Sequence, residues 1–161
     1  MSAHIRVSLT RRGVSCVALL LEDEAPRTCA ALIARMPIEA PAWHSKTSYA
    51  EVYSLFPADE RLPLENLCFA PLPGDLVYFS LARSSFPKAD PRVRDLGEHT
   101  ELSCIGSFYE RHSVHRTESG LVPGSRFAEL VGDAEEWRAA CHSLLTHGNA
   151  QEMLLLERRN P

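Results

Sequence analysis

The residues best placed to do chemistry are His44 and Lys46, which stand two apart in a segment, residues 38–46, rich in β-branched and aromatic side chains. Alternate residues of a strand share one face, so a strand here places both on one side, with Trp43 and Ser45 on the other. An imidazole and an ammonium group together bind a carboxylate or a phosphate, and the imidazole also exchanges protons near neutral pH. A solvated strand face explains the same pattern, because charged side chains on one side of a strand commonly meet only water.

Aromatic residues supply candidates for the apolar wall of a binding site. Tyr78 and Phe79 are adjacent on one expected strand, and Phe108 and Tyr109 on another, so one member of each pair should face the interior of the fold. Phe127 begins a third such strand. Aromatic rings around a few polar groups are typical of small-molecule sites, but the same rings also fill cores.

Glu101 lies near the start of the strand that leads to Tyr109, where it could act as a base or a hydrogen-bond acceptor, or be a plain exposed carboxylate. With nearby histidines it also suggests a metal site. We expect none, because His112 and His115 are not on a convincing helix and strand geometry would separate their imidazoles. The five cysteines form no CxxC pair and are expected to be reduced core residues, so no cofactor is predicted.

The candidate residues need a scaffold, and the sequence predicts one made mainly of strands. Ile5, Val7 and Leu9 alternate with polar residues, and residues 14–21 are almost continuously apolar, which together indicate a hairpin. Further strands are expected at residues 38–46, 50–56, 76–81, 101–109, 127–131 and 151–157. This order favours a β-rich α+β domain, most simply a closed or nearly closed barrel.

Two helices complete the expected fold. The first begins at Pro26, with Asp23 and Glu24 complementing the positive end of its dipole. The second has Asp133 at its N-cap with Glu136 three residues on, an acidic version of the capping box. Its apolar stripe consists of Trp137, Cys141, Leu144 and Leu145, and Gly148 ends it.

Composition limits the classes of partner. The 161 residues are expected to form a single domain over residues 1–161, and the net charge of −4 is spread along the chain. No basic run interleaves with aromatic residues, so nucleic acid is not an expected partner. No secretory signal and no apolar stretch of the ~18 residues that cross a bilayer are present, so we expect no membrane and a cytoplasmic protein.

The element order and several local motifs resemble the bacterial and archaeal proteins of cyclophilin-like fold that form a family of unknown function. The motifs are Met36-Pro37-Ile38-Glu39, the Trp43 strand leading to Glu51-Val52-Tyr53, Pro73-Gly74-Asp75-Leu76-Val77-Tyr78, and Phe127-Ala128 before the last helix. The resemblance covers nearly the whole chain and implies a closed eight-stranded barrel capped by two helices, with no established reaction. The Phe-His-Arg, Gln-Gly-Gly-Asp and Gln-Phe-Phe motifs of true cyclophilins, the prolyl isomerases, are absent.

These observations lead to three hypotheses of different class. The first is a barrel that binds a small anionic metabolite at its mouth and acts on it or only holds it, with residues 83–99 as a surface excursion or a lid. Its ligand-binding residues would be His44, Lys46, Tyr78, Glu101, Tyr109 and Phe127. The second is peptidyl-prolyl isomerisation. The third is a non-catalytic interaction module, with a homodimer as its simplest assembly.

Overall fold

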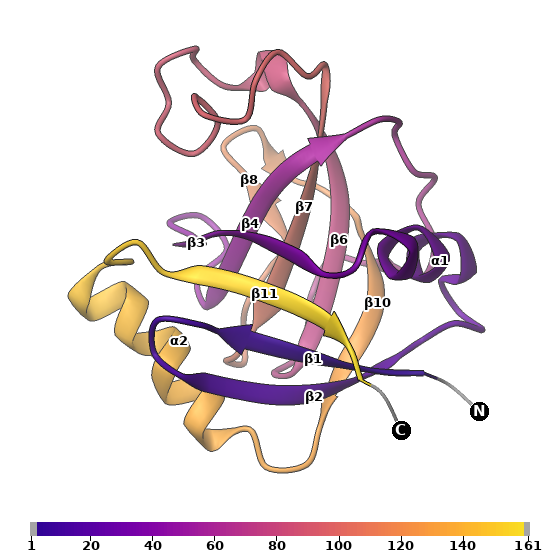
Figure 1. Ribbon diagram of the computed structural model, residues 1–161, viewed down its shortest axis with the longest axis vertical. Coiled ribbons are helices and arrows are strands. Elements are labelled where there is room, and N and C mark those ends of the chain that lie inside the picture. The colour runs from indigo at the N-terminus through magenta and orange to yellow at the C-terminus, as the bar shows by residue number, and fades with distance from the viewer. Residues whose placement is uncertain (1–2, 160–161) are drawn as a thin grey trace.

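The computed structural model describes residues 3–159 and, within that range, consists of a closed antiparallel barrel of eight strands with two α-helices (Figure 1). The prediction of a mainly β, eight-stranded barrel is confirmed. Around the barrel the strands are ordered β2-β1-β11-β3-β4-β7-β6-β10. The last of these, β10, also pairs with the first, β2, and this pairing closes the barrel. The elements are β1 (His4–Leu9), β2 (Val14–Leu20), α1 (Pro26–Arg35), β3 (Ile38–His44), β4 (Glu51–Ala58), β5 (Leu67–Cys68), β6 (Asp75–Ala82), a 3-10 turn (Arg83–Ser85), β7 (Glu101–Phe108), β8 (Arg116–Thr117), β9 (Gly120–Leu121), β10 (Gly124–Val131), α2 (Glu135–His147) and β11 (Met153–Arg158).

The opening hairpin forms as its alternation predicts. Ile5, Val7 and Leu9 are buried in the barrel interior, and β1 pairs with β2 through a turn in which Gly13 adopts a left-handed φ of 66°. A residue with a side chain is strained at this φ, so glycine suits the turn. β11 pairs with the other edge of β1, so the first and last strands lie side by side in the barrel wall.

Helix α1 begins at Pro26, as expected, but the group that caps it comes from elsewhere in the chain. No acidic residue lies in its first turn. Instead, the carboxylate of Glu65 accepts hydrogen bonds from the backbone N–H groups of Arg27 and Thr28, at 3.2 and 2.8 Å. A carboxylate at this position satisfies otherwise unpaired N–H groups and opposes the positive end of the dipole. The segment that follows β4 therefore fixes the start of α1.

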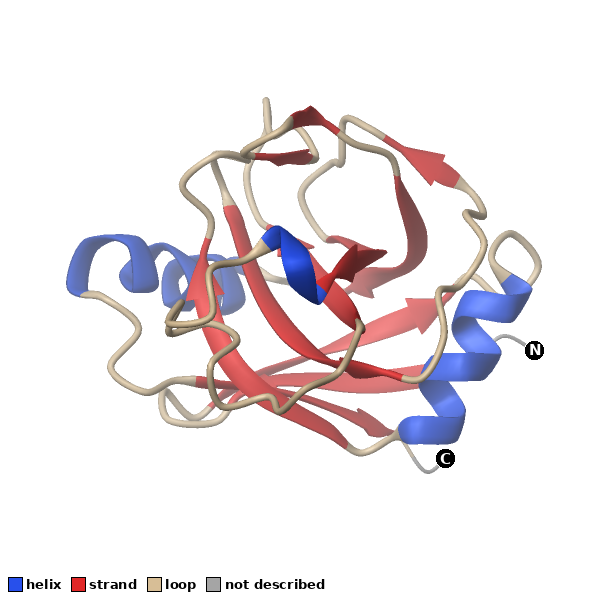
Figure 2. Cartoon of the chain, turned by 90° about the horizontal axis from the view of Figure 1, so that it is seen from above, coloured by secondary structure: helices blue, strands red, loops and turns tan. Residues whose placement is uncertain are grey.

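Helix α2 lies on the opposite side of the barrel from α1 (Figure 2). The predicted capping box is wrong, because the helix begins at Glu135 and its N-cap residue is Ala134, so that Asp133 lies one residue before the N-cap. The Asp133 carboxylate instead accepts a hydrogen bond from the Glu135 N–H at 3.0 Å. The apolar stripe is confirmed for Trp137, Cys141 and Leu144, which are buried, whereas Leu145 is 53% exposed. Three of the four stripe residues thus pack against the barrel.

Apolar side chains form two separate cores, one on each face of the central strands. The larger fills the barrel interior and includes Tyr78, Tyr109 and Phe127. The smaller lies on the outer face of β4, β6 and β7, where residues 83–99 pack and Val93 is completely buried. Tyr78 and Tyr109 point inward while Phe79 packs outward, which confirms the expected division of the aromatic pairs for β6. Residues 83–99 are anchored on the outer wall by this smaller core.

Candidate functional site

His44 and Tyr109, two of the predicted site residues, are in direct contact. Nε2 of His44 lies 2.7 Å from the Tyr109 hydroxyl, and Nδ1 lies 2.8 Å from the carbonyl oxygen of Ser45. Burial lowers the pKa of His44, an effect that its hydrogen bond to the Ser45 carbonyl opposes, and burial raises the pKa of Tyr109 to about 12. Both groups are therefore neutral near pH 7. The imidazole supplies a hydrogen bond there and no positive charge for an anion.

Lys46 does not share a strand face with His44. β3 ends at His44, and the hydroxyl of Ser45 then accepts hydrogen bonds from the N–H groups of Thr47 and Ser48, at 3.2 and 3.0 Å. Such a serine turn bends the backbone away from the sheet. The prediction of a strand through Lys46 is wrong for this reason, and the lysine lies exposed in the loop. Its contact with a ligand stays a prediction.

Glu101 and Phe127 lie in surroundings of opposite kinds. Glu101 begins β7 and forms an ion pair with Arg61, with Nη2 at 3.0 Å from Oε2, on the surface. Phe127 has no exposed surface and packs within the barrel core. Core packing explains the position of Phe127, and the ion pair with Arg61 explains that of Glu101. Any part that either residue plays in binding stays a prediction.

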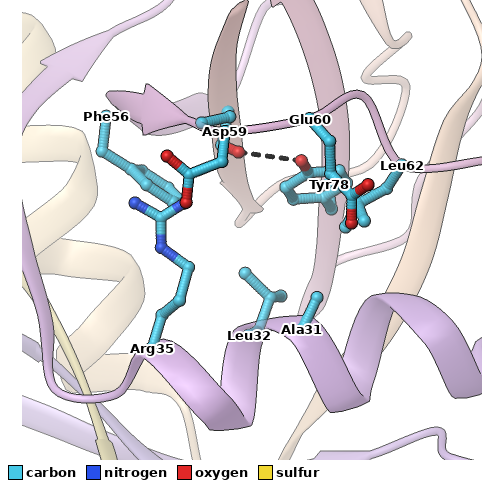
Figure 3. A pocket seen from close by; sticks show the side chains of 10 residues that line it. Ala31, Leu32, Arg35, Phe56, Asp59, Glu60, Leu62 and Tyr78 are labelled. Carbon is cyan, nitrogen blue, oxygen red and sulfur yellow. Dashed lines mark hydrogen bonds between the residues drawn. The ribbon is translucent and has the colours of Figure 1, made fainter.

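Tyr78 is the predicted residue that lines a pocket. A cavity of about 270 Å³ opens between α1, the segment after β4 and the end of the barrel nearest to them (Figure 3). Inside it, the Tyr78 hydroxyl lies 2.8 Å from the Ser103 hydroxyl and 3.4 Å from that of Ser80. The lining residues are Ala31, Leu32, Arg35, Phe56, Ala58, Asp59, Glu60, Leu62, Tyr78 and Ser103. Of the six predicted residues, Tyr78 alone appears in this lining.

Arg35 places a positive charge at the rim of the pocket. It is the last residue of α1, its Nη2 donates to the carbonyl oxygen of Pro57 at 2.6 Å, and its guanidinium lies 5.1 Å from the centre of the Phe56 ring. These contacts hold the guanidinium over the aromatic wall while leaving further N–H groups to donate. Asp59 and Glu60 stand on the facing segment (Figure 3). The pocket thus offers one cation, two carboxylates and a pair of hydroxyls.

Sequence reasoning missed Arg35, Phe56 and Ser103. Alternation along β4 was a usable signal for Phe56, because Val52 and Phe56 both face the interior. Nothing local marks Arg35 or Ser103, since each becomes a pocket residue only when α1 packs beside the ends of β4, β6 and β7.

Histidines elsewhere do not gather into a metal centre. Across residues 3–159, no group of three or more His, Cys, Asp or Glu side chains is arranged to hold a metal ion. His115 is buried, its Nδ1 lies 2.8 Å from the carbonyl oxygen of Val122, and its ring packs edge-on against Phe79 with centroids 4.3 Å apart. Burial lowers its pKa, so it packs as a neutral ring.

Within residues 3–159, no helix is long and apolar enough to cross a bilayer.

Comparison with known proteins identifies a family and two similar folds. The model of a family described as "Protein of unknown function (DUF3830)" matches residues 7–156. No curated protein sequence matches significantly. A structure of McbB in complex with tryptophan is similar with a TM-score of 0.58 and 13% identity over 98% of this chain, which spans 45% of McbB. The solution structure of a hypothetical protein from Archaeoglobus fulgidus is similar with a TM-score of 0.54 and 17% identity, over 98% of this chain and 95% of that one.

Proposed function

The chain belongs to the DUF3830 family of proteins of unknown function, and we propose that it binds a small metabolite carrying a carboxylate in the pocket beside α1. The observation that carries the proposal is the guanidinium of Arg35, held at the rim of a pocket whose wall carries the paired hydroxyls of Tyr78 and Ser103. Guanidinium groups bind carboxylates through two parallel hydrogen bonds. The hydroxyl pair supplies further polar contacts to the rest of the ligand.

The size and charge of the pocket narrow the ligand class. A volume of about 270 Å³ lies just below the roughly 300 Å³ at which drug-sized sites begin, so the ligand is small. Asp59 and Glu60 give the lining more negative than positive charge, which disfavours a simple anion. A zwitterion of amino-acid size places its carboxylate on Arg35 and its ammonium group near these acids. The tryptophan bound to McbB, a protein of similar fold, is a ligand of this kind.

The test is isothermal titration calorimetry with matched ligands: an amino acid, the acid without its amino group, and the amine without its carboxylate. We expect the amino acid to bind best and Arg35→Ala to weaken it about tenfold or more, as for loss of a charge-assisted hydrogen bond. Arg27→Ala, an exposed arginine in the first turn of the same helix, should bind normally. Equal binding by Arg35→Ala and wild type, or no binding of any amino acid or organic acid by the wild type, would refute the proposal.

A second candidate function, self-association as an interaction module, rests on a different observation. The segment before β6 exposes four large apolar side chains, Leu64, Leu67, Phe69 and Leu72, each between 47% and 66% exposed. Leu67 belongs to β5, a two-residue strand that pairs with β10 outside the closed barrel. Exposed apolar residues beside a strand edge favour association with another chain, here a second copy.

Light scattering after size-exclusion chromatography tests this second candidate. A dimer at about 100 µM that Leu67→Lys disrupts would support it, since the substitution places a charge in the contact. Leu145→Lys, which alters a leucine of similar exposure on α2, is the matched control and should leave the dimer intact. A wild-type monomer at that concentration counts against self-association.

Prolyl isomerisation has no comparable observation in its favour and stays a prediction, testable with a standard Xaa-Pro peptide assay.

A further inference from the structure

Glu51, the first residue of β4, carries a carboxyl group that no part of the proposed pocket uses. Its side chain points to the outer face of the barrel wall, with Tyr53 and Leu55, while Val52 and Phe56 face the interior. Glu51 is only 4% exposed. Acidic residues are rarely buried to this degree without a charged partner, so its surroundings need an explanation.

The backbone of β7 makes the space in which this carboxyl lies. A Cβ atom at position 106 would stand 2.2 Å from Oε1 of Glu51, so the carboxyl rests directly on Gly106. Ser45 and Ser48 lie beside it and oppose the effect of burial on its ionisation. Over residues 3–159, no basic nitrogen lies within the 4.0 Å of an ion pair to Glu51. The carboxyl therefore has hydroxyl neighbours and lacks a cation.

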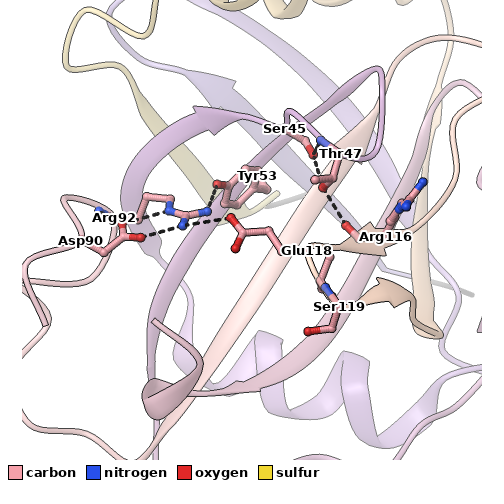
Figure 4. A network of polar contacts seen from close by, with 9 residues as sticks. Ser45, Thr47, Tyr53, Asp90, Arg92, Arg116, Glu118 and Ser119 are labelled. Carbon is pink, nitrogen blue, oxygen red and sulfur yellow. Dashed lines mark hydrogen bonds and ion pairs between the residues drawn. The ribbon is translucent and has the colours of Figure 1, made fainter. Parts of the chain in front are cut away.

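The guanidinium that contacts the neighbouring Tyr53 is committed elsewhere. Arg92, from residues 83–99, forms two hydrogen bonds with the carboxylate of Asp90 at 3.0 and 2.6 Å, and it stacks on Phe86 with 4.9 Å to the ring centre. Its Nη1 donates to the hydroxyl of Tyr53 at 3.2 Å. Figure 4 shows Glu118 next to Arg92, with its Oε1 3.9 Å from Nη2 of the arginine, and Thr47 and Arg116 further away on the same side. Arg92 thus fixes the Tyr53 ring and leaves the carboxyl of Glu51 unpaired.

We propose that the outer face of β4 and β7 holds a second ligand site, in which Glu51 and the ring of Tyr53 bind the ammonium group of a small alkylamine. An ammonium group provides the missing cation and N–H donors for the carboxylate, and the adjacent aromatic ring attracts the same charge. This site is separate from the pocket beside α1, because none of its residues lines that pocket.

Access to the site involves the turn at residues 45–48. Ser48 holds this turn against β8, since its hydroxyl donates to the carbonyl oxygen of Arg116 at 2.9 Å and accepts from the Arg116 N–H at 3.2 Å. Since Glu51 is almost fully covered, a ligand enters when this turn opens. Opening the turn also breaks the hydrogen bond from the Ser45 N–H to the carbonyl oxygen of Glu51, at 2.8 Å, and exposes Ser48, which is completely buried.

Ligand binding at this site is coupled to proton release. Burial raises the pKa of Glu51 to about 7, so a carboxyl that still carries its proton near neutral pH loses it when the ammonium group binds. The other ionisable groups around the carboxyl do not titrate with it. Burial raises the pKa of Tyr53 on the same strand to about 12 and that of Cys104 on β7 well above its usual value, while Arg92 stays protonated in its pair with Asp90. Glu118 on the hairpin side faces the Arg92 guanidinium at 3.9 Å.

The experiment is calorimetry with n-butylammonium chloride at pH 7 in two buffers of different ionisation enthalpy, with tetramethylammonium chloride as a cation that lacks N–H donors. We expect n-butylammonium to bind with release of a fraction of a proton that grows as the pH is lowered, and tetramethylammonium to bind at least tenfold more weakly. Glu51→Gln should abolish both binding and proton release. Glu118→Gln, which removes an exposed carboxylate from the same surroundings, is the control and should behave as wild type.

Gly106→Ala provides a second, independent variant, because its methyl group must displace the carboxyl of Glu51. It should lose binding while circular dichroism still shows the folded barrel. Failure of wild type to bind n-butylammonium, or unchanged binding by Glu51→Gln, would each overturn the proposal. The amino-acid titrations that test the α1 pocket use Arg35→Ala, so the two sites succeed or fail separately.

Discussion

The two faces of β4 carry opposite chemistry. Inward, Val52 and Phe56 join a core that fills the barrel, and outward, Glu51 and Tyr53 stand among hydroxyls, a cysteine and an anchored arginine. A closed barrel of eight strands is just wide enough for its own side chains to fill. Polar chemistry is therefore displaced to the end of the barrel beside α1 and to the outer wall, and the comparison indicates that these two places, not the interior, are where function should be sought.

The largest expected effect comes from removing a ring from the filled interior. Phe127→Ala should lower the free energy of unfolding by about 3–5 kcal/mol, because it removes a completely buried side chain and leaves a cavity. Chemical denaturation measures this change. If Phe127→Ala keeps wild-type stability and weakens amino-acid binding, Phe127 belongs to a site, and the division between interior and outer chemistry is wrong.

Next in size is the pH dependence that Glu51 gives to stability. Its pKa is raised to about 7 in the folded protein from its ordinary value of 4.5, so the folded state holds the proton more tightly. This contribution is fully present below about pH 4 and is lost as the pH rises through about 7, with an upper size of about 3 kcal/mol. The measurement is the difference in free energy of unfolding between wild type and Glu51→Gln from pH 4 to pH 8. A difference that does not change with pH would show that Glu51 ionises normally.

A smaller effect is expected at the outer core. Val93→Ala should cost about 1–2 kcal/mol, since it deletes two buried methyl groups under residues 83–99. Hydrogen exchange should show faster exchange in residues 83–99 than in the barrel strands. Wild-type stability in this variant would mean that residues 83–99 are not anchored to the outer face, and it would favour their function as a lid.

The smallest effect concerns the cap of α1, which positions Arg35 at the other end of the same helix. Glu65→Ala should cost about 1 kcal/mol, because two N–H groups at the start of the helix lose their acceptor. Asp23→Ala is the matched control and should be nearly neutral, since no residue of the first turn depends on it. Thermal denaturation of both variants distinguishes the cap actually present from the one that local sequence suggested.

Local patterns predicted the elements better than the site. The alternation of Ile5, Val7 and Leu9 and the stripe of Trp137, Cys141 and Leu144 reflect the burial of one face, and both are confirmed. The predicted strand that includes Lys46 is too long, because the hydrogen bonds of the Ser45 side chain compete with the sheet for the backbone N–H groups. For the same reason His44 and Lys46 do not share a strand face, and it is Tyr109, a predicted site residue 65 residues away, that contacts the imidazole.

The sequence by itself determined the class of structure, since periodicity, apolar runs and turn residues act over a few neighbouring positions and specify strands and helices directly. Tertiary structure alone decided which polar groups meet. The carboxylate of Glu65 caps α1 from 37 residues away. Arg35, Tyr78 and Ser103 line one pocket from three elements, and the side chain of Glu51 lies over Gly106 of β7. Each of these depends on closure of the barrel, which brings distant segments together and removes water from groups that look ordinary in the chain.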